Sequence, residues 1–282
     1  MKKNRAIFSS IITITLLALI LSSCMEQKPN TKISIDTENS RESYGKTVSI
    51  EPRDDSVKIQ RGKITLSPRQ ENTIYTISGY FNGQIIVKTK NTILKLDNAF
   101  LENTSGKPAI KANAKTELSS AKDSTNYIVT SGRNFSKIGA ISADRSLVLG
   151  GGGTLYVKSM VAHAIEAEGV KIKGSGNFYF EGTEKGSALN CDSLEVEKDK
   201  NFTAYFLNSK NGIKADKHIK VESGNFHLYN NFTAIKVEPK SQIVPEGVVL
   251  SGGKYYLFEN RNFISAPENT VNTTGAEIRS EI

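Results

Sequence analysis

Five acidic residues occupy one position of a repeated sequence pattern and could together bind a metal ion. In each repeat a small residue, alanine or glycine, is followed by isoleucine or leucine, and the acidic residue stands three positions after that isoleucine or leucine. Calcium prefers several oxygen ligands, many of them carboxylates, and is the possible cofactor that these residues indicate. Lys214, Lys217 and Lys236 stand among the acids, so the alternative is a solvated corner that lysines neutralise. We call this set the acid column: Asp144, Glu168, Asp192, Asp216 and Glu238.

A set of aromatic residues could bind sugars. Tyr156, Tyr179 and His227 fall at one position of the pattern, and Tyr205 and Tyr229 lie two residues along their strands. Aromatic rings offer flat faces to the C–H faces of sugars, and neighbouring polar groups fix the orientation of the ligand. The alternative is that these side chains only cover strand edges. Positive charge nearby, as at Lys158 and Lys220, favours an acidic polysaccharide.

No residues indicate catalysis with comparable strength. Glycoside hydrolysis requires two carboxylates in unlike environments, and the acid column gives no sign of such a difference. The histidines His163, His218 and His227 stand at different offsets from the repeat, so they do not have the spacing of a metal site. The residues therefore favour a protein without catalytic activity, and a polysaccharide lyase or glycoside hydrolase remains the alternative.

The N-terminal residues have the pattern of an export signal. Basic residues precede an uncharged, mostly apolar run from Ala6 to Leu21. Ser22, Ser23 and Cys24 follow this run directly. This pattern predicts a lipoprotein signal peptide over 1–23 and lipidation of Cys24, which would bind the protein to a bacterial membrane without a spanning helix. The alternatives are an uncleaved anchor and an ordinary secretory signal. In each case we expect the body to be exported, to the cell surface or the periplasm.

Composition limits the remaining choices. Hydrophobic residues make up 38% of the 282 residues, which is enough for a core, and the net charge is +8. The charges are interspersed and carry no nucleic-acid-binding motif, so we expect no nucleic-acid partner. Residues 24–61 are polar and are predicted to form a tether. Cys191 stands in a column of alanines and is predicted to lie in the core.

From residue 62 onward the sequence repeats with a period near 24 residues. Apolar residues that follow a small residue mark the repeat, and alternating segments such as "VKIK", "LEVE" and "FHLY" lie between the marks. A fixed period of this length is typical of stacked architectures. Phenylalanines also recur, at Phe178, Phe202 and Phe226, and are predicted to stack inside. The marks are Ile86, Ile110, Ile141, Ile165, Leu189, Ile213 and Ile235.

Short strands in a stacked repeat predict an all-β fold, a right-handed parallel β-helix. One repeat cannot bury its apolar face alone, but successive turns can pair with one another at about 4.8 Å. Blades of a propeller need about 40 residues, which is longer than this repeat. We therefore expect about eight rungs over 62–262, followed by a flexible tail over 263–282.

Several segments resemble one bacterial family. They are "TISGYFNGQIIV", "GAISADRSLVLGGGGTLYV", "AIEAEGVKIKGSGNFYFEG" and "NGIKADKHIKVESGNFHLY". They are similar to the carbohydrate-binding domain-containing proteins, and the resemblance extends from about Lys63 to Glu238. It implies a pectate-lyase-like β-helix, a secreted or lipid-anchored protein, and binding of polysaccharide, acidic sugars included, with calcium. Members often carry Asp-Gly before the inward isoleucine, whereas this chain has no carboxylate there.

Together these features predict a surface-anchored, non-catalytic carbohydrate-binding protein. We expect a monomer with two partners, a polysaccharide, for which the positive charge favours an acidic one, and a membrane reached through the lipid on Cys24. The alternatives are a polysaccharide lyase or glycoside hydrolase of the β-helix type, and a structural spacer or adhesin.

Overall fold

A computed structural model describes residues 34–45, 47–133, 138–240 and 246–281 of the chain. The predicted signal peptide, Cys24 and residues 25–33 lie outside these residues. Within the described residues, no helix has both the length and the apolar character needed to cross a membrane.

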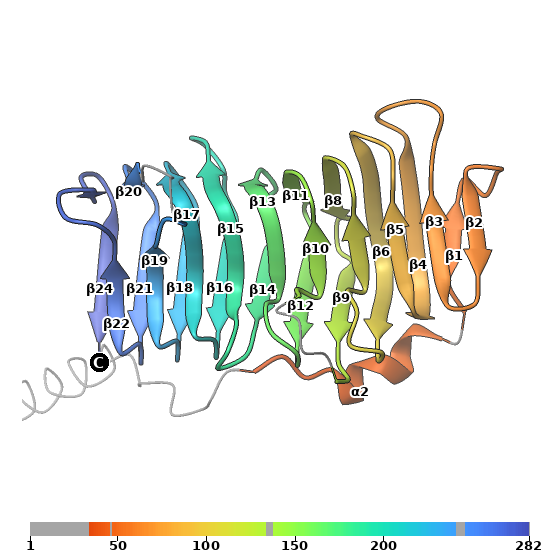
Figure 1. Cartoon of the computed structure of the whole chain (residues 1–282), viewed down its shortest axis with the longest axis horizontal. Helices are drawn as coiled ribbons and strands as arrows, with labels where there is room; N and C mark the ends of the chain where they lie inside the picture. The colour runs from red at the N-terminus through yellow and green to blue at the C-terminus, as the bar shows by residue number, and fades with distance from the viewer. Residues whose placement is uncertain (1–33, 46, 134–137, 241–245, 282) are drawn as a thin grey trace, which may run out of the picture. The chain divides into compact units, whose positions relative to one another are not determined.

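The described residues from Lys63 onward coil into a parallel β-helix, in which each turn pairs with the next (Figure 1). Alternating burial explains this arrangement, because strands such as β12 (Thr154–Ser159) bury every second side chain. Strands pair in parallel between rungs, and identical or similar side chains meet inside. The predicted fold class is confirmed.

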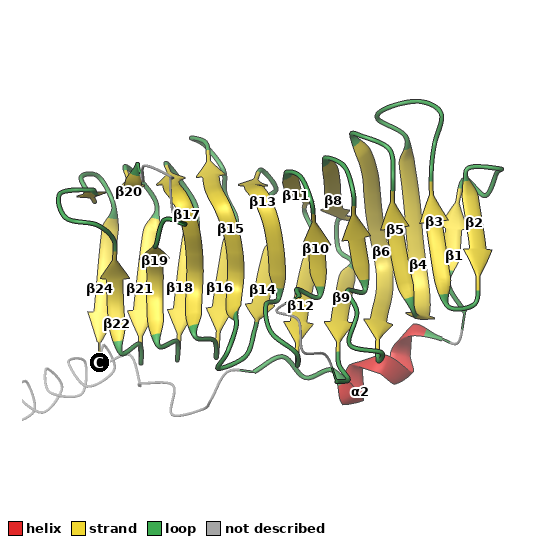
Figure 2. Ribbon diagram, viewed as in Figure 1, coloured by secondary structure: helices red, strands yellow, loops and turns green. Residues whose placement is uncertain are grey.

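Three sheets run along the β-helix, and the first carries the repeat marks (Figure 2). Its strands are β3 (Lys63–Leu66), β5 (Gln84–Val87), β7 (Ile110–Ala112), β10 (Ile141–Ala143), β13 (Ile165–Ile172), β15 (Ser187–Val196), β17 (Asn211–Val221), β19 (Thr233–Val237) and β22 (Asn262–Ser265).

The second sheet is built partly from strands that bend out of the first. It contains the second halves of β13, β15 and β17, together with β4 (Ile74–Asn82), β6 (Thr92–Asn103), β8 (Thr116–Ser120), β11 (Leu147–Gly151), β20 (Gly247–Leu250) and β23 (Val271–Asn272).

The third sheet carries the aromatic residues. It begins with the second halves of β4 and β6 and continues through β9 (Thr125–Thr130), β12, β14 (Asn177–Glu181), β16 (Thr203–Leu207), β18 (Asn225–Tyr229), β21 (Lys254–Phe258) and β24 (Glu277–Glu281).

Inner ladders make up the core. The first sheet stacks Ile110, Ile141, Ile165 and Leu189 at one position, and all four are buried. The predicted mark Ile86 is wrong by one residue, because Ile85 pairs with Ile110 and is the buried one. Cys191 lies in the core as predicted, paired between residues 167 and 215.

The phenylalanine column has a different register from the predicted one. Phe178 and Phe226 are buried in one ladder, but the residue between them is Ala204. Phe202 precedes strand β16 and is also buried. Its ring meets Phe178 and Phe226 edge-on, with centroid distances of 6.0 and 5.4 Å. The small side chain of Ala204 leaves the space that the Phe202 ring fills from the turn.

Both ends of the chain differ from the predicted tether and tail. Residues 34–44 form α2 (Glu38–Arg41) and η1 (Glu42–Tyr44), which pack on the third sheet. The strands β1 (Ser49–Glu51) and β2 (Val57–Gln60) then pair antiparallel with β4 and β3. At the other end, where a flexible tail was predicted over 263–282, the described residues 263–281 include β23 and β24, which add the last rung.

Candidate functional site

Aromatic side chains form one continuous ladder on the outer face of the third sheet. Strand register places them at one position of successive rungs, with centroid distances of 4.4 to 4.7 Å and interplanar angles of 0 to 23°. This spacing follows the distance between paired strands, which is about 4.8 Å. We call this set the aromatic ladder: Tyr127, Tyr156, Tyr179, Tyr205, His227 and Tyr256.

Two of the residues predicted to bind sugar occupy other positions relative to the aromatic ladder than expected. Tyr205 lies in the ladder itself, between Tyr179 and His227. Tyr229 lies outside it, two residues further along β18, where it pairs with Leu207 and Phe258. Tyr156, Tyr179 and His227 share one row, as their spacing predicts.

The stacking decides which part of each ring a ligand can reach. Tyr179 lies 4.5 Å from Tyr156 on one side and 4.4 Å from Tyr205 on the other. Both faces of its ring are therefore covered by other rings, and the same is true of the other internal members. A sugar cannot stack flat on them, so the expectation of face-to-face sugar contacts is wrong for this geometry. The partly exposed side chains present ring edges and hydroxyl groups instead.

Two rows of side chains flank the aromatic ladder. On one side the strands carry hydroxyl and amide groups and, on the last rung of the row, a lysine, all partly or fully exposed. On the other side the row holds Glu102, Lys158 and Glu181 and then becomes apolar. The polar row is Thr125, Thr154, Asn177, Thr203, Asn225 and Lys254.

Burial shifts the pKa of three ring groups of the ladder toward their uncharged forms. It raises the pKa of Tyr179 to about 12, with further contributions from the neighbouring Tyr205 and Tyr156, and it also raises the pKa of Tyr156. It lowers the pKa of His227 to about 4. The Nδ1 atom of His227 is buried without a hydrogen-bond partner. The ladder therefore offers neutral hydroxyl donors and a neutral imidazole rather than a charged acid or base.

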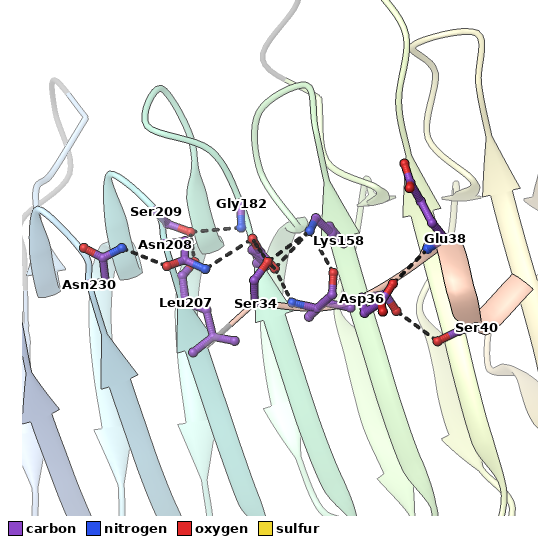
Figure 3. A network of polar contacts seen from close by, with 12 residues as sticks. Ser34, Asp36, Glu38, Ser40, Lys158, Gly182, Leu207, Asn208, Ser209 and Asn230 are labelled. Atoms are coloured by element: carbon purple, nitrogen blue, oxygen red, sulfur yellow. Dashed lines mark hydrogen bonds and ion pairs between the residues drawn. The ribbon is translucent and has the colours of Figure 1, made fainter. Parts of the chain in front are cut away.

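Beside the ladder, an ion pair links two rungs. The Nζ atom of Lys158 lies 3.3 Å from Oε2 of Glu181, and both side chains are mostly buried. Nδ2 of Asn208 donates to Oε1 of Glu181 over 3.2 Å, and Nδ2 of Asn230 donates to Oδ1 of Asn208 over 2.8 Å. Figure 3 shows this row of polar contacts crossing successive rungs.

An N-terminal segment, which we call the strap (residues 34–44), covers part of this face. The backbone N–H of Ile35 donates to Glu181 over 2.7 Å, and Lys158 donates to the carbonyl oxygen of Ile35 over 2.8 Å (Figure 3). Further along, Arg41 pairs with Glu102 at 2.7 Å. Sequence reasoning missed the strap, because its polar composition gives no signal for contacts with residues so distant in the chain.

The acid column has basic partners instead of converging on one point. Asp144 pairs with Lys111, and Glu168 lies 3.4 Å from Arg145. Lys240 brings two members together, because its Nζ contacts both Asp192 and Asp216.

The remaining member of the column, Glu238, pairs with Lys214 at 3.0 Å and Lys236 at 2.9 Å, and these hydrogen bonds lower its pKa to about 2. Over the described part of the chain, no three acidic, histidine or cysteine side chains are grouped as a metal site requires. Calcium binding by the acid column stays a prediction.

The comparisons with known proteins agree with this fold. Residues 60–186 match the family model described as "Carbohydrate-binding domain-containing protein". A solved structure, the polysaccharide lyase-like protein from C. thermocellum in a gadolinium derivative, is 16% identical. It aligns over 82% of this chain and 94% of that chain, with a TM-score of 0.56. No curated protein matches the sequence.

At 16% identity the structural likeness shows the fold alone, and the family match carries the relationship. The resemblance to the carbohydrate-binding domain-containing proteins is thereby confirmed over residues 60–186, on a β-helix similar to that of the polysaccharide lyase-like protein.

Proposed function

We propose that the outer face of the third sheet binds polysaccharide without cleaving it. The observation that carries this proposal is the aromatic ladder beside a row of hydroxyl and amide groups, both repeated at the rung spacing. A polysaccharide is also periodic, so several sugar units can meet equivalent groups on successive rungs. Contacts along one chain add, because each later contact is intramolecular.

The ligand would contact ring edges and hydroxyl groups, since neighbouring rings cover the ring faces. Tyrosine hydroxyls both donate and accept hydrogen bonds, as sugar hydroxyls require. The exposed Lys254 at the end of the polar row favours an acidic polysaccharide.

The absence of catalysis is part of the proposal. The carboxylates beside the ladder, Glu102 and Glu181, belong to β6 and β14 and are both buried. Arg41 neutralises the first and Lys158 the second. Each is therefore held by a cation, whereas glycoside hydrolysis uses a pair of carboxyl groups that flank the bond to be cleaved. Release of reducing or unsaturated sugar ends by the wild-type protein would favour the lyase or hydrolase alternative.

Binding to insoluble polysaccharides and to soluble uronate polymers tests the proposal. Tyr205→Ala should weaken binding about tenfold, and Tyr205→Phe should weaken it several-fold, because the hydroxyl group is the part that a ligand reaches. Phe232→Ala is the matched control, since Phe232 is an exposed aromatic residue outside the ladder. Equal binding by wild type, Tyr205→Ala and Tyr205→Phe, all folded, would contradict a site on this face.

We also propose that Cys24 carries lipid and holds the protein to a bacterial membrane, facing the cell surface or the periplasm. The sequence Leu21-Ser22-Ser23-Cys24 after an apolar run supports this proposal.

A further inference from the structure

The strap lies over one part of the aromatic ladder and leaves another part open. The ring of Tyr44 packs at 5.5 Å from Phe100 and 5.7 Å from Tyr127. The Oγ of Ser40 donates to the hydroxyl oxygen of Tyr127 over 3.0 Å. Figure 1 shows α2 crossing the strand ends on this side of the β-helix. Among the described residues, the contacts of the strap extend as far as Glu181, and Tyr205, His227 and Tyr256 further along are partly exposed.

The strap uses the groups that a sugar would use. It engages a ladder hydroxyl at Tyr127, and it engages Lys158 and Glu181 through its own backbone N–H and carbonyl groups. The hydroxyl of Tyr44 donates to the carbonyl oxygen of Thr125 over 2.8 Å, beside the polar row. These contacts are hydrogen bonds to the outer surface, and a polysaccharide on the same rungs would need the same atoms.

The groups beneath the strap keep partners when it leaves. Glu181 retains Lys158 and Asn208, and Glu102 retains the hydroxyl of Tyr80. Removal of the strap would therefore expose paired groups to water instead of leaving an unpaired buried charge. The β-helix does not depend on the strap to satisfy these carboxylates.

The strap buries little apolar surface. Its helix α2 has one turn and no buried residue, and its first turn is held by Asp36, whose Oδ1 accepts from the backbone N–H groups of Glu38 and Asn39. Within the strap, only Ile35 and Thr37 are buried. Segments with few buried apolar contacts belong to the least stable parts of a fold and open most readily.

We propose that the strap is an intramolecular competitor for the polysaccharide-binding face. This inference rests on the function proposed above. With the strap in place, a ligand reaches the rungs of Tyr205, His227 and Tyr256. With the strap displaced, the site extends along Tyr179, Tyr156 and Tyr127. The equilibrium between the two states lowers the apparent affinity for long chains, because only the open fraction binds along the full ladder.

The test combines a weakened strap with ligands of two lengths. The double variant Arg41→Ala/Tyr44→Ala removes the ion pair with Glu102 and the ring contacts with Phe100 and Tyr127. Glu42→Gln is the matched control, because Glu42 is an exposed strap residue. The probes are polygalacturonate and its trimer, with xylan and xylotriose as neutral counterparts. Hydrogen exchange of residues 34–44, followed by mass spectrometry, reports strap opening without any ligand.

We expect the double variant to exchange faster over 34–44 and to bind the long probe about threefold or more tightly, with unchanged affinity for the trimer. We also expect the long probe to increase exchange over 34–44 in the wild type. A variant that deletes residues 34–44 should show the same gain in affinity for the long probe. If the double variant exchanges no faster than the wild type, the affinity of this deletion variant tests the competition instead.

Two outcomes separate the strap from the site. The competition would be overturned if residues 34–44 of the wild type stay protected from exchange when the long probe saturates it. It would also be overturned if the double variant exchanges faster without binding the long probe more tightly. Both outcomes leave the proposed function in place. Failure of all the proteins to bind every probe, despite faster exchange in the variant, would overturn the proposed function and the competition together.

Discussion

At the scale of single residues, Phe202 and Gly224 depend on each other. A Cβ atom on Gly224 would lie 2.6 Å from the Cζ atom of Phe202, and the φ angle of Gly224 is +96°. Glycine is therefore required here both by the close approach of the ring and by the backbone. The buried ring in turn fills the space beside Ala204, between Phe178 and Phe226.

Substitution of this pair should show strong coupling. Phe202→Ala should lower the free energy of unfolding by about 3–5 kcal/mol, the cost of removing a buried aromatic ring. Gly224→Ala should cost about 1–3 kcal/mol from strain and overlap with the ring. In the double variant the overlap disappears, so the loss should be smaller than the sum of the two by about 1 kcal/mol. Denaturant unfolding of the three variants measures this, and additive losses would contradict the contact.

The ladder histidine should make stability depend on pH. Burial lowers the pKa of His227 from 6.5 to about 4, so between these values the unfolded chain binds a proton that the folded protein does not. The contribution of neutral His227 to the free energy of unfolding is therefore fully present above pH 6.5 and decreases as the pH falls toward 4. Because His227 is partly exposed, solvent screening reduces the effect to about 1–2 kcal/mol.

His227→Tyr provides the comparison, since tyrosine occupies the neighbouring rungs at this position. The wild type should lose about 1–2 kcal/mol more than His227→Tyr when unfolding is measured at pH 7 and then at pH 4. Parallel losses in both proteins would mean that His227 titrates normally in the fold.

At the scale of strands and turns, the repeat period predicts the inner ladders well. The residues from Ile110 to Ile235 follow the marks because short β-helix strands must stack similar side chains. Register was harder to predict where turns vary in length. Counting residues from the marks wrongly places Phe202 in the inner ladder of Phe178 and Phe226. The same count places Tyr205 outside the aromatic ladder. Val170 pairs with Leu194, 24 residues later, but Asn177 pairs with Thr203, 26 residues later, so the turn before β16 is two residues longer than the preceding one and Tyr205 reaches the aromatic ladder.

The strap could not be predicted for a different reason. Its contacts are non-local: Arg41 reaches Glu102, 61 residues away, and Ile35 reaches Glu181, 146 residues away. Its composition is polar, and composition alone is typical of a tether. Sequence reasoning placed Tyr156, Tyr179 and His227 in one row but missed Tyr127 and Tyr256, and it gave no sign of the stacking that covers the ring faces. That stacking depends on side-chain orientation across paired strands, which periodicity does not specify.

At the scale of the whole molecule, anchoring is the first prediction. Cys24→Ser should prevent lipid attachment, so the protein should move from the membrane fraction to the soluble exported fraction or remain unprocessed. Cell fractionation and the intact mass of the mature protein measure this. The control is Ser40→Ala, which changes a polar residue beyond the cleavage region. An unchanged membrane fraction together with an unchanged mass would contradict lipidation.

The last rung protects the open end of the β-helix. Strand β24 pairs with β21, and β23 pairs with β20, so together they cover two strand edges. The covered strands are the more apolar ones, with Tyr255, Leu257 and Leu250 buried, whereas β24 is exposed and carries Glu277, Arg279 and Glu281. Charged residues on an edge strand oppose pairing with other chains.

Removal of residues 266–282 should therefore cause association rather than leave the protein unchanged. The truncated protein would expose β20 and β21 as unpaired apolar edges, which are templates for pairing with a second chain. We expect a lower soluble yield, and light scattering that rises with concentration. In the same truncated chain, Val249→Lys and Phe258→Lys place charge on the outer side of β20 and β21 and should restore much of the solubility, because charge on an edge disfavours further pairing. A truncated protein as soluble and as stable as the full chain would mean that β23 and β24 contribute little to the fold.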